Sequence, residues 1–178
     1  MTTGILAYAA YIPRLRLQRK AIAEANGWLN PALKGLARGE RAICNWDEDP
    51  VTMAVEAARD ALVGRDRGSV RDLRFASTTF PFLDRLNAGV VAEALRLSEE
   101  IAASDVGATQ RAATSALASA LKGGTETLVV AAEKRETRAA SPLEMASGDG
   151  AAAVVIGPAS EKGGEPVAVL KGSATRTV

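Results

Sequence analysis

The chain has 178 residues, which is enough for one domain of generous size or for one half of a larger fold. Hydrophobic residues make up 47% and charged residues 24% of the sequence, and this ordinary globular composition argues against intrinsic disorder. The formal net charge is +1. Because general nucleic-acid binding and membrane-surface binding both need a surplus of positive charge, neither a nucleic acid nor a membrane is expected as a partner.

Two residue counts exclude whole classes of chemistry. The sequence has no histidine, so an imidazole base, a Ser-His-Asp triad or a histidine metal site cannot form within it. A single cysteine excludes an intrachain disulfide and a multi-cysteine zinc site, and it is compatible with a reducing, cytoplasmic location. The first ten residues lack the basic start of a signal peptide, and the longest apolar stretch, residues 151–156, is too short to cross a bilayer.

Hydrophobic patterning predicts strands and helices in alternation, followed by a run of strands. In chain order, we expect a strand at 4–12, a helix at 18–25, an irregular segment at 26–46, a helix at 50–64, a strand at 73–79, a helix at 87–97, a strand at 100–106, an alanine-rich helix at 112–121, a strand at 126–132, a polar loop at 134–147, and strands at 150–157 and 167–174. This order predicts one α/β layered domain with a mostly parallel sheet. The alanine-rich helix suits a central, buried position.

An acidic run, Asp47-Glu48-Asp49, stands directly before Pro50. Acidic groups are favourable at the positive end of a helix, Asp49 is a suitable N-cap, and proline fits the first helical turn. The alternative is that these carboxylates ligate a hard cation. We favour the helix start, because Pro50 and the apolar periodicity behind it already explain the acids.

Two further candidates have plain alternatives. Cys44 is a possible nucleophile, but it lies in a polar loop and the chain has no histidine to take its proton. Arg14, Arg16, Arg19 and Lys20 are possible phosphate ligands, but scattered basic residues more often form a solvated surface. No glycine-rich nucleotide-binding motif of the Rossmann or P-loop kind is present.

The segment 147–157, SGDGAAAVVIG, is the most informative stretch. Gly148 and Gly150 permit a tight turn into a strand. The small residues that follow let another backbone lie close. Asp149 can accept hydrogen bonds from backbone amides of the turn. Taken alone, the segment predicts a well-formed turn and strand, in which these three residues are structural.

Together with two other segments, this stretch resembles the thiolase superfamily, and it is most similar to the N-terminal half of hydroxymethylglutaryl-CoA synthases and their ketoacyl-synthase III relatives. The other segments are GILAYAAYIPRLRL at 4–17 and DEDPVTMAVEAARDAL at 47–62. The resemblance implies an α/β, thiolase-like layered half (α-β-α), with a mostly parallel five-stranded sheet and an antiparallel end strand. Residues 1–178 would form this N-terminal domain. The C-terminal half would be absent, so the chain would be a fragment or one piece of a split protein.

The resemblance also implies acyl-CoA thioester substrates, no cofactor beyond that CoA and no metal. In the family, a cysteine heads the central helix, and here Gln110 falls at that position. An amide cannot carry an acyl thioester, but it can orient a carbonyl or a water. The family's glutamate acid/base falls nearest Thr79, which cannot transfer protons as a carboxylate does. Asp84 or Glu93 are alternatives for that role.

Beside these positions, the resemblance implies substrate-binding roles for Arg111 and Phe80. It also implies a homodimer through the strand at 101–106, since a short exposed edge strand is a liability unless it is paired.

Two functions follow from this resemblance. The first is an acyltransferase-like, acyl-CoA-processing enzyme of lipid metabolism that forms or cleaves a carbon–carbon bond next to a thioester, including aldolase-like cleavage, without a covalent acyl-cysteine. The alternative is a non-catalytic thiolase-like subunit that partners an active acyltransferase or an OB-fold acyl-CoA-binding protein.

Overall fold

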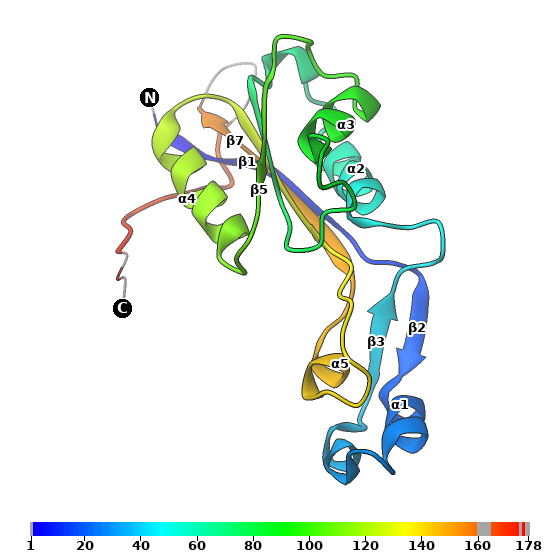
Figure 1. The fold of residues 1–178 in the computed structure, drawn as a ribbon. Helices are drawn as coiled ribbons and strands as arrows, with labels where there is room; N and C mark the ends of the chain where they lie inside the picture. Colours follow the sequence, from blue (N-terminus) through cyan, green and yellow to red (C-terminus); the bar gives the residue numbers. More distant parts are fainter. Residues whose placement is uncertain (1, 160–164, 175, 177–178) are drawn as a thin grey trace.

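The computed structural model describes residues 2–159, 165–174 and 176, and its main feature is a six-stranded sheet (Figure 1). The strand order is β5-β4-β6-β7-β1-β8. The strands are β1 (Thr3–Tyr11), β4 (Asp72–Ala76), β5 (Ala102–Val106), β6 (Thr127–Glu133), β7 (Gly150–Pro158) and β8 (Ala168–Val169). β1, β4, β5 and β6 run in one direction, whereas β7 and β8 run in the other.

The mixed sheet agrees with the predicted α/β class and differs from the prediction in two respects. The expected antiparallel strand at the end, β8, has two residues rather than the predicted 167–174. β7 is also antiparallel and lies inside the sheet, between β6 and β1. The physical reason is the connection that precedes it. A parallel neighbour needs a crossover on one face of the sheet, usually a helix, and between β6 and β7 the chain forms only one short helix, α5 (Pro142–Ala146).

Helices cover both faces of the sheet (Figure 1). α2 (Pro50–Ala61) and α3 (Asn87–Ala94) pack on one face, and α4 (Ala112–Gly123) packs on the other. The larger core lies between the sheet and α2 and α3, and includes the fully buried Met53, Phe75 and Leu128. This arrangement confirms the α-β-α layers.

The expected central burial of the alanine-rich helix holds for one face only. α4 turns Ala116 and Ala120 toward the sheet, where both are buried. Thr114 and Ser115 are exposed on the part of the helix that points away. Within the described chain, α4 therefore has one packed face and one open face.

The start of α2 is built as the acidic run predicts. The Asp49 side chain accepts a hydrogen bond from the backbone N–H of Thr52 at 2.7 Å. The Thr52 hydroxyl in turn accepts one from the backbone N–H of Asp49 at 2.8 Å. This reciprocal capping box satisfies two amides at the helix N-terminus, and Pro50 occupies the first turn.

A small lobe projects from one end of the sheet (Figure 1). It consists of β2 (Leu15–Gln18), α1 (Arg19–Asn26), the 3-10 helix η1 (Pro31–Leu36), β3 (Glu40–Ile43) and α5. β2 and β3 pair antiparallel, and a separate core includes Ile22, Leu33 and Met145. The helix at 18–25 was predicted correctly. The segments 26–46 and 134–147 contain β3, η1 and α5, which are too short to give a periodic signal.

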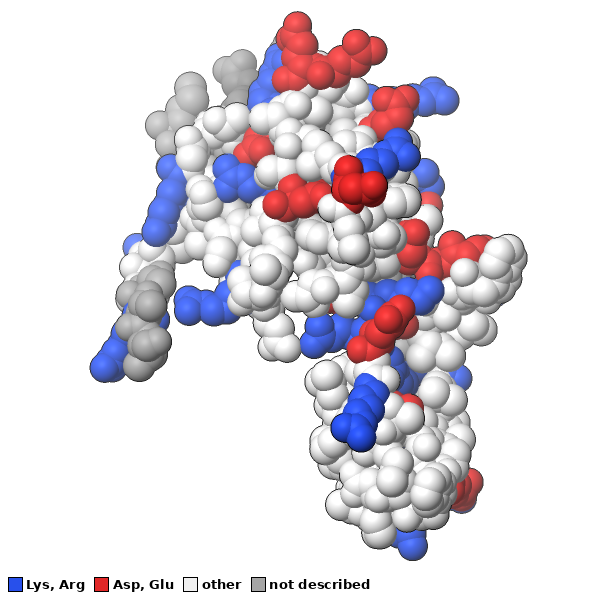
Figure 2. All heavy atoms as spheres, viewed as in Figure 1, with Lys and Arg blue, Asp and Glu red and all other residues white. Residues whose placement is uncertain are grey.

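The visible surface mixes charges of both signs, as the small net charge suggests (Figure 2). The lobe in this view is largely uncharged at its lower end (Figure 2). Within the part of the chain that the structure describes, no helix has the length and apolar character needed to span a membrane.

Candidate functional site

Asp149 joins the lobe to the sheet. Its side chain accepts hydrogen bonds from the backbone N–H of Cys44 at 2.8 Å and from that of Arg135 at 2.9 Å. The Arg41 guanidinium lies 3.7 Å from the same carboxylate, and both side chains are only 6% exposed. Asp149 therefore binds backbone amides, as predicted, but these amides belong to two distant segments rather than to its own turn.

Of the two neighbouring glycines, only Gly150 lies at a close backbone approach. A Cβ on Gly150 would lie 3.2 Å from the Ile12 side chain and 3.3 Å from the Tyr11 carbonyl oxygen. A side chain at residue 150 would therefore require the end of β1 to shift by a few tenths of an ångström. Gly148 lies beside Ala42 of β3, where a Cβ would make ordinary contacts at 3.6 Å.

A tight turn joins β5 to α4 and carries Gln110. Ala108 in this turn has a positive φ of 68°, which is an uncommon and strained conformation for a residue with a side chain. The backbone N–H of Ala112 donates to the Thr109 carbonyl oxygen at 3.0 Å and starts the helix. Gln110 is exposed and stands just before the N-cap residue Arg111. The sequence thus placed Gln110 correctly at the start of this helix.

A cavity of about 440 Å³ opens beside the start of α4. Its walls come from the ends of β1, β4 and β6, the beginning of β7 and the β5–α4 turn, and they consist mainly of alanines. The polar side chains among the lining residues are Ser77, Thr109, Gln110 and Glu133. Gln110 therefore lies at a cleft, which the resemblance to the thiolase superfamily requires.

Glu133 was not predicted, and it is the only titratable residue among the described residues that line this cavity. One carboxylate oxygen accepts the backbone N–H of Thr78 at 2.8 Å. The other accepts the hydroxyls of Thr78 at 2.8 Å and Thr79 at 3.0 Å. Arg135 lies 3.8 Å from it and donates to the Thr78 hydroxyl at 2.7 Å. The available signal was the position of Glu133 at the end of an apolar strand.

The structure places the other predicted site residues around this cavity rather than in its wall. Thr79 donates to Glu133 and accepts the backbone N–H of Lys134 at 3.1 Å. The Phe80 ring packs edge-to-face on Phe75 at 5.1 Å between ring centres. Arg111 is exposed at the helix start. The substrate-binding roles of Phe80 and Arg111 stay predictions.

The two alternative carboxylates, Asp84 and Glu93, are not among the residues that line the cavity. Both are exposed, Glu93 on α3, which covers the opposite face of the sheet. The carboxylate that the fold brings to the cavity is Glu133 instead.

Cys44 lies in the connection between β3 and α2, away from the start of α4. Burial, and then the nearby Asp149 carboxylate, raise the pKa of the Cys44 thiol to about 12. Its sulfur lies 3.5 Å from that of Met53. Because a protonated thiol is a weak nucleophile, this environment favours the structural interpretation of Cys44.

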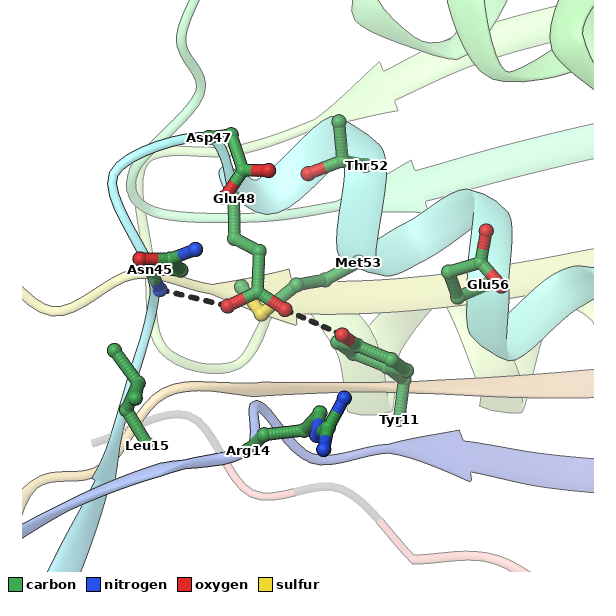
Figure 3. A pocket seen from close by; sticks show the side chains of 9 residues that line it. All are labelled: Tyr11, Arg14, Leu15, Asn45, Asp47, Glu48, Thr52, Met53 and Glu56. Atoms are coloured by element: carbon green, nitrogen blue, oxygen red, sulfur yellow. Dashed lines mark hydrogen bonds between the residues drawn. The ribbon is translucent and has the colours of Figure 1, made fainter.

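A second cavity, of about 670 Å³, lies beside the start of α2 (Figure 3). Glu48 accepts hydrogen bonds there from the Tyr11 hydroxyl and from the backbone N–H of Asn45. The bond with Glu48 raises the pKa of Tyr11 to about 12. Glu48 thus stabilises the connection between β3 and α2, and Asp49 caps α2. Within the described residues, no cluster of His, Cys, Asp and Glu is suited to hold a metal ion.

A third cavity, of about 680 Å³, lies on the lobe and has a different chemistry. Its lining includes Trp28, which is 81% exposed, and three cationic side chains, Lys20, Lys34 and Arg38. Glu24 also lines it and pairs with Lys20 at 3.7 Å. An aromatic surface with a surplus of positive charge is suited to a phosphate-bearing aromatic ligand.

Comparison with profiles of known protein families finds no match for this chain. Among curated proteins, it is 35% identical over 166 residues to the hydroxymethylglutaryl-CoA synthase of Aeropyrum pernix, covering 88% of this chain and 45% of that synthase. The corresponding synthase of Pyrococcus horikoshii is 32% identical over 177 residues, covering 96% of this chain and 48% of the synthase. The chain spans about half the length of the curated relatives it matches.

Solved structures of similar proteins superpose on this chain. A hydroxymethylglutaryl-CoA synthase complexed with CoA superposes with a TM-score of 0.77 at 24% identity, over 88% of this chain and 42% of that chain. The priming β-ketosynthase of the R1128 polyketide pathway superposes with a TM-score of 0.75 at 26% identity, over 89% of this chain and 50% of that chain. The chain is therefore hydroxymethylglutaryl-CoA synthase-like and has the α/β fold of the thiolase superfamily.

Proposed function

We propose that this chain is the acyl-CoA-binding half of a condensing-type enzyme that forms or cleaves a carbon–carbon bond next to a thioester without a covalent acyl-cysteine. The observation that carries the proposal is Gln110, which lines the cavity at the start of α4 where the family is expected to have its reactive cysteine. A carboxamide forms no acyl thioester, but it donates and accepts hydrogen bonds. Gln110 is thus suited to hold the thioester carbonyl oxygen or a water.

The relatives support a CoA thioester as the substrate. One structural neighbour is complexed with CoA and another with 3-hydroxy-3-methylglutaryl coenzyme A. The cavity beside Gln110 is small and mainly apolar, which suits a short acyl group.

The lobe cavity supports the same proposal, because it suits the nucleotide end of CoA. The Trp28 indole offers a surface on which adenine can stack. Lys20, Lys34 and Arg38 supply positive charge for phosphates. Among the basic residues singled out in the sequence, Lys20 is the one that the fold brings to this cavity.

The open surfaces of the chain are consistent with two protein partners. The relatives are about twice as long as the part that this chain matches, so we propose that a C-terminal thiolase-like half packs on the open face of α4. β5 is at one edge of the described sheet, and an edge strand of this kind favours pairing with a second copy. A homodimer through β5 would give a dimer mass in sedimentation of the complete gene product, and a monomer would contradict it.

The test is to incubate the complete gene product with isotopically labelled acyl-CoA and candidate aldehydes, ketones or second thioesters. We expect carbon–carbon bond formation or cleavage, and we expect no labelled acyl group on the intact protein. A stable acyl adduct on this chain would contradict the proposal. Turnover that appears only when an active acyltransferase or an OB-fold acyl-CoA-binding protein is added would instead support the non-catalytic subunit.

A further inference from the structure

We infer that Glu133 is the acid/base residue of this site, an assignment that rests on the proposed function. It takes the place of the glutamate that the family is expected to carry near Thr79. Glu133 reaches the cavity from the end of β6, whereas Thr79 follows β4. The two strands are parallel neighbours, so their carboxyl ends meet at the same edge of the sheet.

Glu133 lies where an acid/base residue could reach a substrate held by Gln110. Glu133 and Gln110 line the same cavity from different elements, β6 and the β5–α4 turn. Among the described lining residues, Glu133 is the only one with a carboxylate or any other acid/base side chain. An acyl group placed beside Gln110 would therefore have one carboxylate available to exchange protons with it.

The Glu133 carboxylate also keeps hydrogen-bonding capacity for a substrate. An ionised carboxylate has about four lone-pair positions, and the Glu133 side chain accepts three hydrogen bonds from Thr78 and Thr79. These donors fix the carboxylate and leave one position for a substrate. The side chain is also 34% exposed, so it is accessible from the cavity.

The residues that hold the Glu133 carboxylate are themselves held by hydrogen bonds to other parts of the fold. Arg135 donates to the Thr78 hydroxyl at 2.7 Å, and its backbone N–H donates to Asp149 at 2.9 Å. Asp149 is also tied to the lobe through Cys44. Thr78, Arg135 and Asp149 are therefore positioning residues for Glu133, because their hydrogen bonds fix the direction in which the carboxylate points.

The proposed step is a reversible proton transfer. The Glu133 carboxylate takes a proton from the carbon next to the thioester. The electron pair of that C–H bond becomes the carbon–carbon double bond of the enolate, and the negative charge moves to the thioester oxygen, where the Gln110 amide can donate. The carboxylic acid then returns a proton to the same carbon. No oxidant or second reactant is needed.

The test follows hydrogen exchange at this carbon in D₂O, using acetyl-CoA, propionyl-CoA and a medium-chain acyl-CoA and the complete gene product. We expect Glu133→Gln to slow exchange by about 100-fold or more, the usual scale for losing an acid/base residue. CoA affinity should not change. Glu133→Asp should retain part of the rate, because it keeps a carboxylate at this position.

The matched control is Glu126→Gln, the same substitution close to the beginning of β6, where Glu126 accepts from Ser69 at 2.6 Å. Circular dichroism checks that each variant is folded. Equal exchange in folded Glu133→Gln and wild type would overturn the role of Glu133. Exchange absent from a wild-type protein that binds the thioesters would also overturn it, while leaving acyl-CoA binding intact. Failure to bind any CoA thioester would contradict the proposed function itself.

Discussion

Cys44 is the only thiol in the chain, and its surroundings keep it protonated. Because its pKa is raised to about 12, we expect negligible alkylation by iodoacetamide near pH 8, where an ordinary cysteine of pKa about 8.5 reacts readily. Reactivity should return on unfolding in urea, where burial and Asp149 no longer act on the sulfur. Rapid labelling of the folded protein near neutral pH would contradict this account of the thiol.

A substitution of Trp28 tests whether the lobe cavity binds the nucleotide end of CoA. If the lobe cavity holds the adenine of CoA, Trp28→Ala should weaken CoA binding by about 1–3 kcal/mol, the scale of base stacking on an aromatic side chain. Isothermal titration calorimetry measures this change. Trp46→Ala is the matched control, since Trp46 is 89% exposed and lies outside the lining of the lobe cavity. Equal affinities in the two variants would show that the nucleotide of CoA does not bind in this cavity.

At the scale of elements, a buried ion pair between Arg41 and Asp149 lies where the lobe joins the sheet. Asp149→Ala leaves the Arg41 guanidinium buried without its carboxylate and removes the acceptor of two backbone amides. We expect a loss of about 3–5 kcal/mol in the free energy of unfolding, as for other broken buried pairs. Urea denaturation measures it, with Asp66→Ala, at the cap of an exposed 3-10 turn, as control. A loss no larger than in that control would contradict the role of the pair.

Hydrogen exchange adds a local readout for the same variant. We expect faster amide exchange in β2 and β3 of the lobe, whereas β4 and β6 in the sheet core should stay protected. The reason is that Asp149 fastens the connection after β3, but it does not contribute to the core between the sheet and α2 and α3.

The same scale shows why some elements could be predicted from sequence and others could not. α2 has a proline, an N-cap and a long apolar face, and each of these is a local signal. β3 has four residues and α5 has five, and both are stabilised by the lobe core and by Arg41 and Asp149 rather than by their own periodicity. Contacts between distant segments leave no local pattern.

The residues of the candidate site also divide into those with a local sequence signal and those that depend on contacts between distant segments. Gln110 could be located because a turn and an alanine-rich helix follow one another in sequence. Glu133 could not, because its importance depends on β4 and β6 being neighbours in the sheet, which brings Thr78 and Thr79 to its carboxylate. The direction of β7 was also missed, since a run of apolar residues says nothing about its pairing partner.

At the scale of the whole molecule, the chain matches about half the length of its relatives, and the cavity at the start of α4 is the site that we propose to be reactive. We propose that residue 110 occupies the position of a nucleophile and that this chain uses no nucleophile there. A cysteine introduced at this position would test both parts, because a thiol close to a helix N-terminus ionises more readily.

The most direct measurement is intact mass after incubation with acyl-CoA, in a Cys44→Ala background. We predict no acyl adduct with Gln110 in place, an adduct in Gln110→Cys, and none in Asp60→Cys, a thiol at an exposed position near the end of α2. An adduct on the protein that retains Gln110, or equal labelling at positions 110 and 60, would contradict the account.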